Sequence, residues 1–244
     1  MRKLILAIAF LMLSSSVSAE TLLIENFEHN TDAIGLISET NGTIATSSTV
    51  ASGGIYSCKT DITTAGGAAN SLAKYAEDFG ATIHGRFRYY ATSGLVATMD
   101  NDNEYVEIFS IYNNDISEML VRFTIYRTSG ANRLVVFYNL NGVFDISTNV
   151  LPSSDAWHTI TFDFYRHATD GTLTWTIDGV SQGIAGTFDT GDSNSGRIYY
   201  GSVNSTGMTG AYYIDDVILD SSKEISAYGW TVQQGGAVGS SYQF

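Results

Sequence analysis

Two carboxylates, Glu104 and Glu107, stand three residues apart at the start of an apolar run and are the best candidates in the chain for acid–base chemistry. Hydrolysis of a glycosidic bond needs two carboxyl groups facing one cleft, one as acid and the other as nucleophile or base. Residues three apart in a β-strand point to opposite faces of the sheet. Unless a bulge intervenes, we therefore expect no hydrolytic site from this pair and no catalytic residue in the chain.

The histidines and the single cysteine add no further catalytic or metal centre. His158 alternates onto the same side as Ile160, which predicts a packed, hydrogen-bonded imidazole. His29 and His84 have no cysteine or histidine at metal-ligand spacing. One cysteine cannot form an intrachain disulfide, and we interpret Cys58 as a small buried apolar residue.

Acidic loops offer oxygen ligands of the kind that calcium prefers. Asp100, Asp102 and Glu104 alternate in one loop, but the glycine of a full EF-hand loop is missing there. Asp189 and Asp192 belong to a second loop. The alternative for each loop is a set of solvated acidic side chains. A structural calcium ion is thus a prediction of the sequence, with Asp189 and Asp192 among its candidate ligands.

Aromatic side chains supply a candidate carbohydrate surface, because a ring face stacks on the CH face of a pyranose while polar neighbours bind its hydroxyls. The aromatic residues on polar faces or in loops are Tyr112, Tyr126, Tyr138, Tyr165, Tyr199 and Trp230. We take Tyr112, Tyr126, Tyr138 and Trp230 as the candidate ligand-binding residues. The alternative is packing, since tyrosine is common in sheets. We interpret Trp157 and Trp175 as core residues.

These residues must be positioned by β-strands. From Trp157 to Val180, apolar and polar residues alternate with period two, and Asp170-Gly171 and Asp178-Gly179 mark turns. Similar runs recur along the chain, at Leu22–Phe27, Gly85–Tyr90, Tyr105–Tyr112, Leu120–Tyr126, Leu134–Tyr138, His158–Phe164, Leu173–Ile177, Arg197–Tyr200 and Tyr212–Leu219. A helix is predicted only at Ser71–Phe79, with a strand as the alternative. The fold class is all-β, an antiparallel two-sheet β-sandwich.

Two segments carry a resemblance to a known family. WHTITFDFYRHATDGTLTWTIDG, from Trp157 to Gly179, and RIYYGSVNSTGMTGAYYIDDVIL, from Arg197 to Leu219, resemble the laminin G and concanavalin A-like jelly rolls. That superfamily includes lectins, glucanases, lyases and adhesion modules, so the resemblance implies a fold more than an activity. The Glu-x-Asp-x-x-Glu signature of laminarinase-like hydrolases is missing, and so are the Gln-x-His and Arg-x-Glu motifs of alginate-lyase-like jelly rolls.

The two ends of the chain are also similar to β-sandwich carbohydrate-binding modules, through IENFEHN near the N-terminus and YIDDVIL near the C-terminus. In those modules, matching carboxylates of the first and last strands hold a structural ion. The resemblance therefore implies Glu28 and Asp215 as further calcium ligands.

The N-terminus predicts export. Arg2 and Lys3 precede ten apolar residues, and small side chains ending at Ala19 follow, which is typical of a cleaved signal peptide. We expect a signal peptide at 1–19, one β-sandwich domain at 20–220 and a Gly/Ser-rich tail at 221–244. The protein would be secreted, periplasmic or on the cell surface, with no membrane span. Its net charge of −13 disfavours nucleic acid and other polyanions as partners.

The function best supported by the sequence is non-catalytic carbohydrate binding or surface adhesion, assisted by calcium, with a neutral glycan or cell-surface polysaccharide as partner. A glycan-cleaving enzyme of the same fold is the first alternative. A structural surface module without a sugar site is the second.

Overall fold

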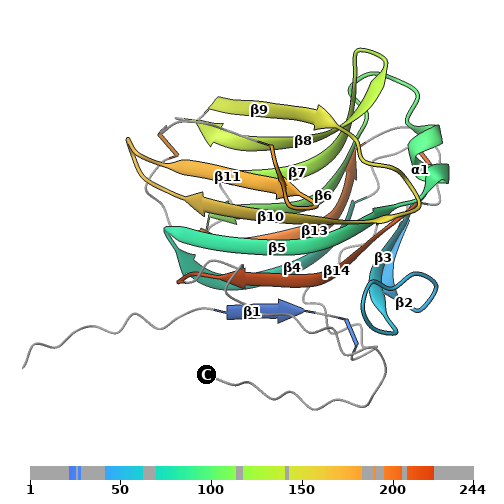
Figure 1. Cartoon of the computed structure of the whole chain (residues 1–244), viewed down its shortest axis with the longest axis horizontal. Coiled ribbons are helices and arrows are strands. Elements are labelled where there is room, and N and C mark those ends of the chain that lie inside the picture. Colours follow the sequence, from blue (N-terminus) through green and yellow to red (C-terminus); the bar gives the residue numbers. More distant parts are fainter. Residues whose placement is uncertain are drawn as a thin grey trace, which may run out of the picture.

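The computed structural model describes residues 22–25, 27–28, 42–62, 70–113, 118–140, 143–182, 189–190, 195–204 and 208–222. Within these residues the chain is almost wholly β-strand, with one helix of six residues. The strands form two antiparallel sheets that pack face to face (Figure 1). The predicted all-β, antiparallel two-sheet sandwich is confirmed. The predicted signal peptide and the tail beyond Ser222 lie outside the described residues.

The first sheet, called here the eight-stranded sheet, has the spatial order β12-β11-β10-β5-β14-β3-β2, and β1 also pairs with β14. Its strands are β1 (Leu22–Glu25), β2 (Gly42–Ser47), β3 (Ser57–Ile62), β5 (Thr82–Ala91), β10 (Trp157–Tyr165), β11 (Thr172–Ile177), β12 (Val180–Ser181) and β14 (Gly210–Asp220). One edge of β14 is shared, because β3 pairs with its first half and β1 with its second half. The first and last strands of the described chain therefore lie side by side.

The second sheet, called here the six-stranded sheet, has the order β4-β13-β6-β7-β8-β9. Its strands are β4 (Asn70–Gly80), β6 (Tyr105–Asn113), β7 (Met119–Thr128), β8 (Ala131–Leu140), β9 (Val143–Val150) and β13 (Ser195–Asn204). The short helix α1 (Ser93–Thr98) follows β5, and the Thr92 hydroxyl caps it by accepting a hydrogen bond from Leu95 N.

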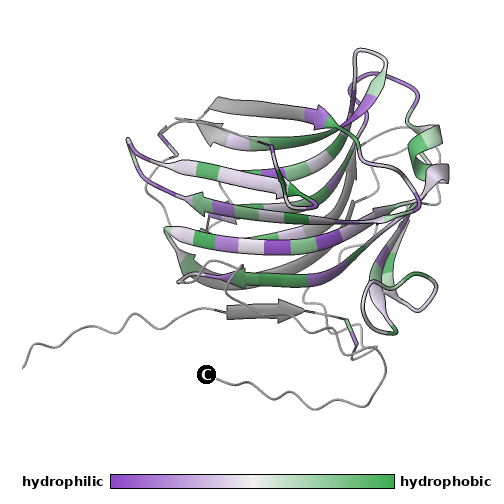
Figure 2. Ribbon diagram, in the orientation of Figure 1, coloured by the Kyte–Doolittle hydropathy of each residue, from purple (hydrophilic) through white to green (hydrophobic). Residues whose placement is uncertain are grey.

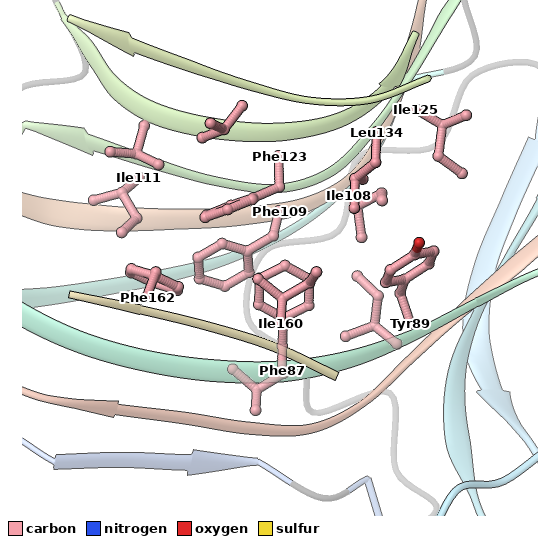
Figure 3. Packing of buried hydrophobic residues seen from close by; sticks show 14 of the residues in the cluster. Phe87, Tyr89, Ile108, Phe109, Ile111, Phe123, Ile125, Leu134, Ile160 and Phe162 are labelled. Carbon is pink, nitrogen blue, oxygen red and sulfur yellow. The ribbon is translucent and has the colours of Figure 1, made fainter. Parts of the chain in front are cut away.

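Aromatic rings from both sheets fill the core. The Phe87 and Phe109 rings stack with centroids 4.8 Å apart, and the Phe123 ring lies 5.2 Å from that of Phe162 (Figure 3). The Phe123 ring also lies 5.6 Å from that of Trp175. Burial alternates strictly along β5 and β10, as the alternating hydropathy along these strands also indicates (Figure 2). Each strand therefore has one core face and one outer face.

The turn between β11 and β12 confirms one prediction about local structure. Asp178 and Gly179 both have positive φ, 49° and 79°, as a type I′ turn requires. The Asp178 carboxylate binds His158 Nδ1 at 2.7 Å and accepts from Thr159 N at 2.8 Å. The second His158 nitrogen, Nε2, bonds the Ser153 carbonyl at 2.8 Å. The imidazole is thus packed and hydrogen-bonded, as predicted.

Other sequence predictions need correction. Ser71–Phe79 is not a helix but lies within strand β4, because pairing with β13 satisfies its backbone and overrides a weak helical pattern. Trp157 is not a core residue. It lies on the outer face of β10, where it is half-buried, while the neighbouring His158 points inward. Helix α1 is an element that the sequence did not predict. In the described part of the chain, no helix is long and apolar enough to cross a membrane.

Candidate functional site

A β-bulge in strand β6 determines which side chains share the outer face of the six-stranded sheet. The pairing register with β7 shifts between Glu107 and Phe109, which makes Ile108 an extra residue. One extra residue reverses the alternation of side chains beyond it. Ile108 and Phe109 both join the core, and Glu107 and Ser110 both point away from it.

The bulge assembles a group of polar and aromatic side chains on this outer face, called here the Glu107 cluster. Cross-strand pairing places residues of β13, β6, β7 and β8 next to one another along the sheet. The members of the cluster are Tyr105, Glu107, Ser110, Tyr112, Arg122, Phe137 and Tyr199.

The centre of the Glu107 cluster is an ion pair. Arg122 Nη1 lies 3.5 Å from Glu107 Oε2, and the Ser110 hydroxyl donates a short hydrogen bond to Glu107 Oε1. The guanidinium lies over two rings, 5.0 Å from the Tyr105 centroid and 4.5 Å from the Phe137 centroid. Because a guanidinium is attracted to a ring face, these rings orient Arg122 as well as covering it.

Burial changes the protonation behaviour of this group. Removal from water raises the pKa of the Glu107 carboxyl above its usual value, although Arg122 and Ser110 act in the opposite direction. Burial and the Glu107 charge raise the pKa of the Tyr112 hydroxyl to about 12. The Tyr112 ring meets the Tyr199 ring edge to face, with centroids 5.0 Å apart. At neutral pH, Tyr112 is therefore a hydrogen-bond donor and not a ready base.

The structure brings two of the four predicted ligand-binding residues to this face. Tyr112 belongs to the Glu107 cluster. Tyr126 lies on the same side of the sheet, with its ring edge-on to Phe137 at 5.9 Å, and its hydroxyl donates to Asn103 Oδ1 at 2.8 Å. These two tyrosines remain candidates for sugar contact.

The other two are not placed on this face. Tyr138 is only 6% exposed and packs in the core between the sheets, so its prediction as a sugar platform is corrected. An inward position follows from its place in β8, where it shares the core side with Leu134 and Val136. Trp230 lies outside the described residues.

Glu104 does not pair with Glu107. It precedes β6, and its carboxylate accepts hydrogen bonds from the backbone N and the side-chain Nδ2 of Asn101, at 3.1 and 3.0 Å. Asp102 of the same loop accepts from Gly130 N at 2.9 Å. These carboxylates organise the loop through N–H donors, and the described contacts do not gather them around a cation.

Arg122, Ser110 and Tyr105 are residues of the cluster that sequence reasoning missed. Arg122 had one signal in the sequence, as the single charged residue in the run from Met119 to Tyr126. A charge at such a position predicts an outward side chain with a partner on a neighbouring strand. The partner itself depends on the bulge in β6.

A second group lies where β14 meets the loop between β2 and β3. The Glu28 carboxylate accepts hydrogen bonds from Ile55 N and Tyr56 N, with distances from 2.9 to 3.0 Å. Asp215 Oδ2 accepts from Ser52 N at 2.9 Å. A Cβ atom at Gly54 would lie 2.0 Å from Glu28 Oε1, so a larger residue at this position would have to displace the Glu28 carboxylate.

Negative charge is concentrated in this second group. Burial, followed by the neighbouring Asp216 charge, raises the pKa of Asp215 to about 7, and Glu28 adds to the effect. Arg88 lies 3.3 Å from Asp216 and offsets that carboxylate. Glu28 and Asp215, which the resemblance to carbohydrate-binding modules implied as calcium ligands, are both bound by the loop between β2 and β3.

The donors of the second group fit a calcium ion in part. Two carboxylates and nearby loop carbonyls are hard oxygen ligands. Among the described residues, however, no group of three or more His, Cys, Asp or Glu side chains is arranged to hold a metal. An ion bound there would use Glu28 and Asp215 together with backbone or hydroxyl oxygens. Of the other predicted pair, Asp189 is half-buried beside Thr190, and Asp192 lies outside the described residues.

This architecture defines a concanavalin A-like jelly-roll β-sandwich, as the sequence resemblance predicted. No protein-family model matches the chain, and no curated protein matches it.

Solved structures match the fold. The "Cellulose induced protein, Cip1" is 16% identical, with a TM-score of 0.59, over 82% of this chain and 97% of that one. The alginate lyase AlyC3 is 7% identical, with a TM-score of 0.51, over 67% of this chain and 74% of that one. The carbohydrate esterase vb_24B_21 from Shiga toxin-encoding bacteriophage phi24B is 16% identical, with a TM-score of 0.51, over 81% of this chain and 99% of that one. Similarity at these identities concerns the fold.

Proposed function

We propose that this protein is an exported carbohydrate-binding module and that its binding surface is the outer face of the six-stranded sheet. One observation carries the proposal. Arg122 is held over the rings of Tyr105 and Phe137 and paired with Glu107, so fixed polar groups lie directly beside aromatic faces. Sugar recognition needs this combination, since rings stack on CH faces while charged and hydroxyl groups bind sugar hydroxyls.

A neutral glycan or cell-surface polysaccharide is the proposed partner. The Arg122 charge is offset by Glu107 at 3.5 Å, which leaves no net positive charge from this pair for an anionic sugar. The net charge of −13 repels anionic polymers as well. Two structural neighbours with TM-scores above 0.5 are described as an alginate lyase and a carbohydrate esterase, which is consistent with a carbohydrate partner.

Binding to soluble neutral polysaccharides, measured by affinity electrophoresis, tests the proposal. We expect Tyr112→Ala and Arg122→Gln each to weaken binding about tenfold, the effect of losing a central contact worth more than 1 kcal/mol. Arg127→Gln is the matched control, because Arg127 bonds Asn132 at 3.3 Å, outside the Glu107 cluster.

Removal of Arg122 leaves the buried Glu107 unpaired and lowers stability, so each variant is first compared in its melting temperature. Tyr112→Phe keeps the ring and removes only the hydroxyl, which gives a variant that folds if Arg122→Gln does not. Saturable binding that is unchanged in both Tyr112 variants would contradict the placement of the site.

A glycan-cleaving enzyme is the second candidate, favoured by the raised pKa of Glu107 beside two tyrosines. A carboxyl that keeps its proton can act as a general acid. Release of reducing ends or unsaturated sugars, lost in a folded Glu107→Gln variant, would establish this alternative. Absence of both turnover and binding would favour a structural surface module.

We also propose a structural calcium ion at Glu28 and Asp215. The support is that one loop binds both carboxylates, through Ser52 N to Asp215 and through Ile55 N and Tyr56 N to Glu28. A divalent cation between them would relieve the repulsion of buried like charges.

A further inference from the structure

A set of aromatic rings lies on the outer face of the eight-stranded sheet, opposite the face that carries the Glu107 cluster. Trp157 of β10, Tyr90 of β5 and Tyr213 of β14 are direct cross-strand neighbours. The Tyr90 centroid is 5.7 Å from that of Trp157 and 5.7 Å from that of Tyr213. We call these three residues the Trp157 patch.

The buried Tyr213 ring supports the other rings of the Trp157 patch. Tyr213 is 4% exposed and meets Tyr90 edge to face at 86°, so it forms the base of the patch. Trp157 and Tyr90 are half-buried and reach the surface. Rings on rigid neighbouring strands lose little side-chain freedom on binding, which favours their use as contact surfaces.

A carboxylate is fixed at the rim of the patch. Asp155 is exposed and has a positive φ of 58°. Its backbone N donates to the Ala91 carbonyl at 2.9 Å. Its Oδ1 accepts from Ser93 N at 2.9 Å and from the Tyr90 hydroxyl at 3.5 Å. Bonds to Ser93 lower the pKa of this carboxyl, which therefore stays ionised at neutral pH.

The charged neighbours of the patch point to an uncharged ligand. Lys59, across the strand pair from Tyr213, is paired with Asp61 at 2.5 Å. Arg88, two residues before Tyr90, is paired with Asp216. Both cations are thus already neutralised, while the exposed Asp155 carboxylate repels anions and accepts hydrogen bonds from hydroxyl groups.

We propose that the Trp157 patch is a second carbohydrate-binding surface, which takes a neutral glycan chain. One pyranose stacks on the Trp157 ring, the next lies against Tyr90, and a hydroxyl group donates to Asp155. Ring faces flanked by an acceptor are the chemistry that recognises a neutral sugar. The two surfaces, on opposite sheets, would let one molecule contact two glycan chains, which raises its avidity for a polymer.

The chain offers a matched control for this surface. Tyr165 lies at the other end of β10, on the same outer face, and is 37% exposed. Its ring stacks on His167, away from the Trp157 patch. Tyr165→Ala therefore removes an exposed ring of the same sheet without touching the proposed surface.

The experiment uses the Arg122→Gln variant as background, so that the first proposed surface is weakened. Soluble β-glucan, xylan and mannan serve as probes in affinity electrophoresis. We expect residual binding to at least one of them to fall about tenfold on Trp157→Ala and on Tyr90→Ala, and to be unchanged by Tyr165→Ala. Should Arg122→Gln not fold, Tyr112→Ala replaces it as background.

Fluorescence supplies a second readout. The glycan should shift the tryptophan emission to shorter wavelength. Trp157→Phe should abolish that shift and Trp230→Phe should leave it, while Trp175 is buried in the core. Equal loss of binding in Trp157→Ala, Tyr90→Ala and Tyr165→Ala would overturn the proposal. Binding that does not change in Trp157→Ala, when that variant has the same melting temperature as its background, would also overturn it. A change in oligomeric state on Trp157→Ala without glycan binding would assign the patch to protein contact and overturn it too. If the Glu107 cluster does not bind glycan but the Trp157 patch does, Arg122→Gln should leave binding unchanged and Trp157→Ala should remove it.

Discussion

At the scale of single residues, Glu107 is the carboxylate of the proposed first surface, and it is almost wholly removed from water. It is 5% exposed, yet it keeps one arginine and one hydroxyl as partners. A buried ion pair is weak evidence for stability, because desolvation offsets the attraction. Under the proposed function, the pair serves recognition, where a fixed charge pattern orients a ligand.

A pH titration of stability tests the state of Glu107. Its pKa is raised in the folded protein, so the folded state holds this proton more tightly than the unfolded state does. The stabilisation is complete below the usual glutamate range and is lost as the pH rises through the folded pKa. A tenfold difference in proton affinity between the two states corresponds to about 1.4 kcal/mol. Urea unfolding from about pH 4 to pH 8 should show a steeper loss for the wild type than for Glu107→Gln. Parallel curves would contradict a raised pKa.

At the scale of elements, strand β11 combines a core tryptophan with outward-facing threonines, of which Thr174 is exposed. Trp175 is 1% exposed and touches the Phe123 ring of the opposite sheet. Trp175→Ala should therefore cost roughly 3–5 kcal/mol of unfolding free energy in denaturant titrations. Thr174→Ala, one position along the strand and exposed, should cost well under 1 kcal/mol. Equal effects of the two substitutions would reverse the assignment of faces.

The same strands show how far sequence reasoning reaches. Period-two alternation places Ile160, Phe162 and Trp175 correctly, because each strand has one dry face and one wet face. The same alternation puts Trp157 on the outer face with Thr159, and its prediction as a core residue is wrong because it followed the size of the side chain instead. Aromatic size alone does not determine burial when neighbouring rings, here Tyr90, shield part of the surface.

The Glu107 cluster could not be predicted, because a single bulge controls it. Strict alternation would put Glu107 and Tyr112, five residues apart, on opposite faces. The extra residue at Ile108 reverses this and unites them. The only sign of the bulge in the sequence is the pair of consecutive apolar residues Ile108 and Phe109, and such pairs also occur in regular strands. Arg122 depends in the same way on the register between β6 and β7.

At the scale of the whole molecule, the second group links the beginning and the end of the described chain. Glu28 follows β1, and Asp215 belongs to β14, the strand with which β1 pairs. The loop between β2 and β3 supplies N–H donors to both carboxylates. A cation at this place would bind only the folded chain, because unfolding separates ligands that lie far apart in sequence.

Calcium should therefore raise the stability of the entire sandwich. At about a hundred times its dissociation constant, an ion that binds only the folded state adds roughly 2.7 kcal/mol. The melting temperature of the full chain should rise with calcium and fall with chelator, and Asp215→Asn should abolish the difference. Asp61→Asn is the control, since that carboxylate is paired with Lys59 and should leave the calcium response intact. Identical melting curves in calcium and chelator would remove the ion from the proposal. Asp215 lies on β14, an interior strand of the eight-stranded sheet, so an ion bound there can stabilise the sheet without touching a glycan. If calcium raises the melting temperature but does not change glycan binding, the role of the ion is in folding alone.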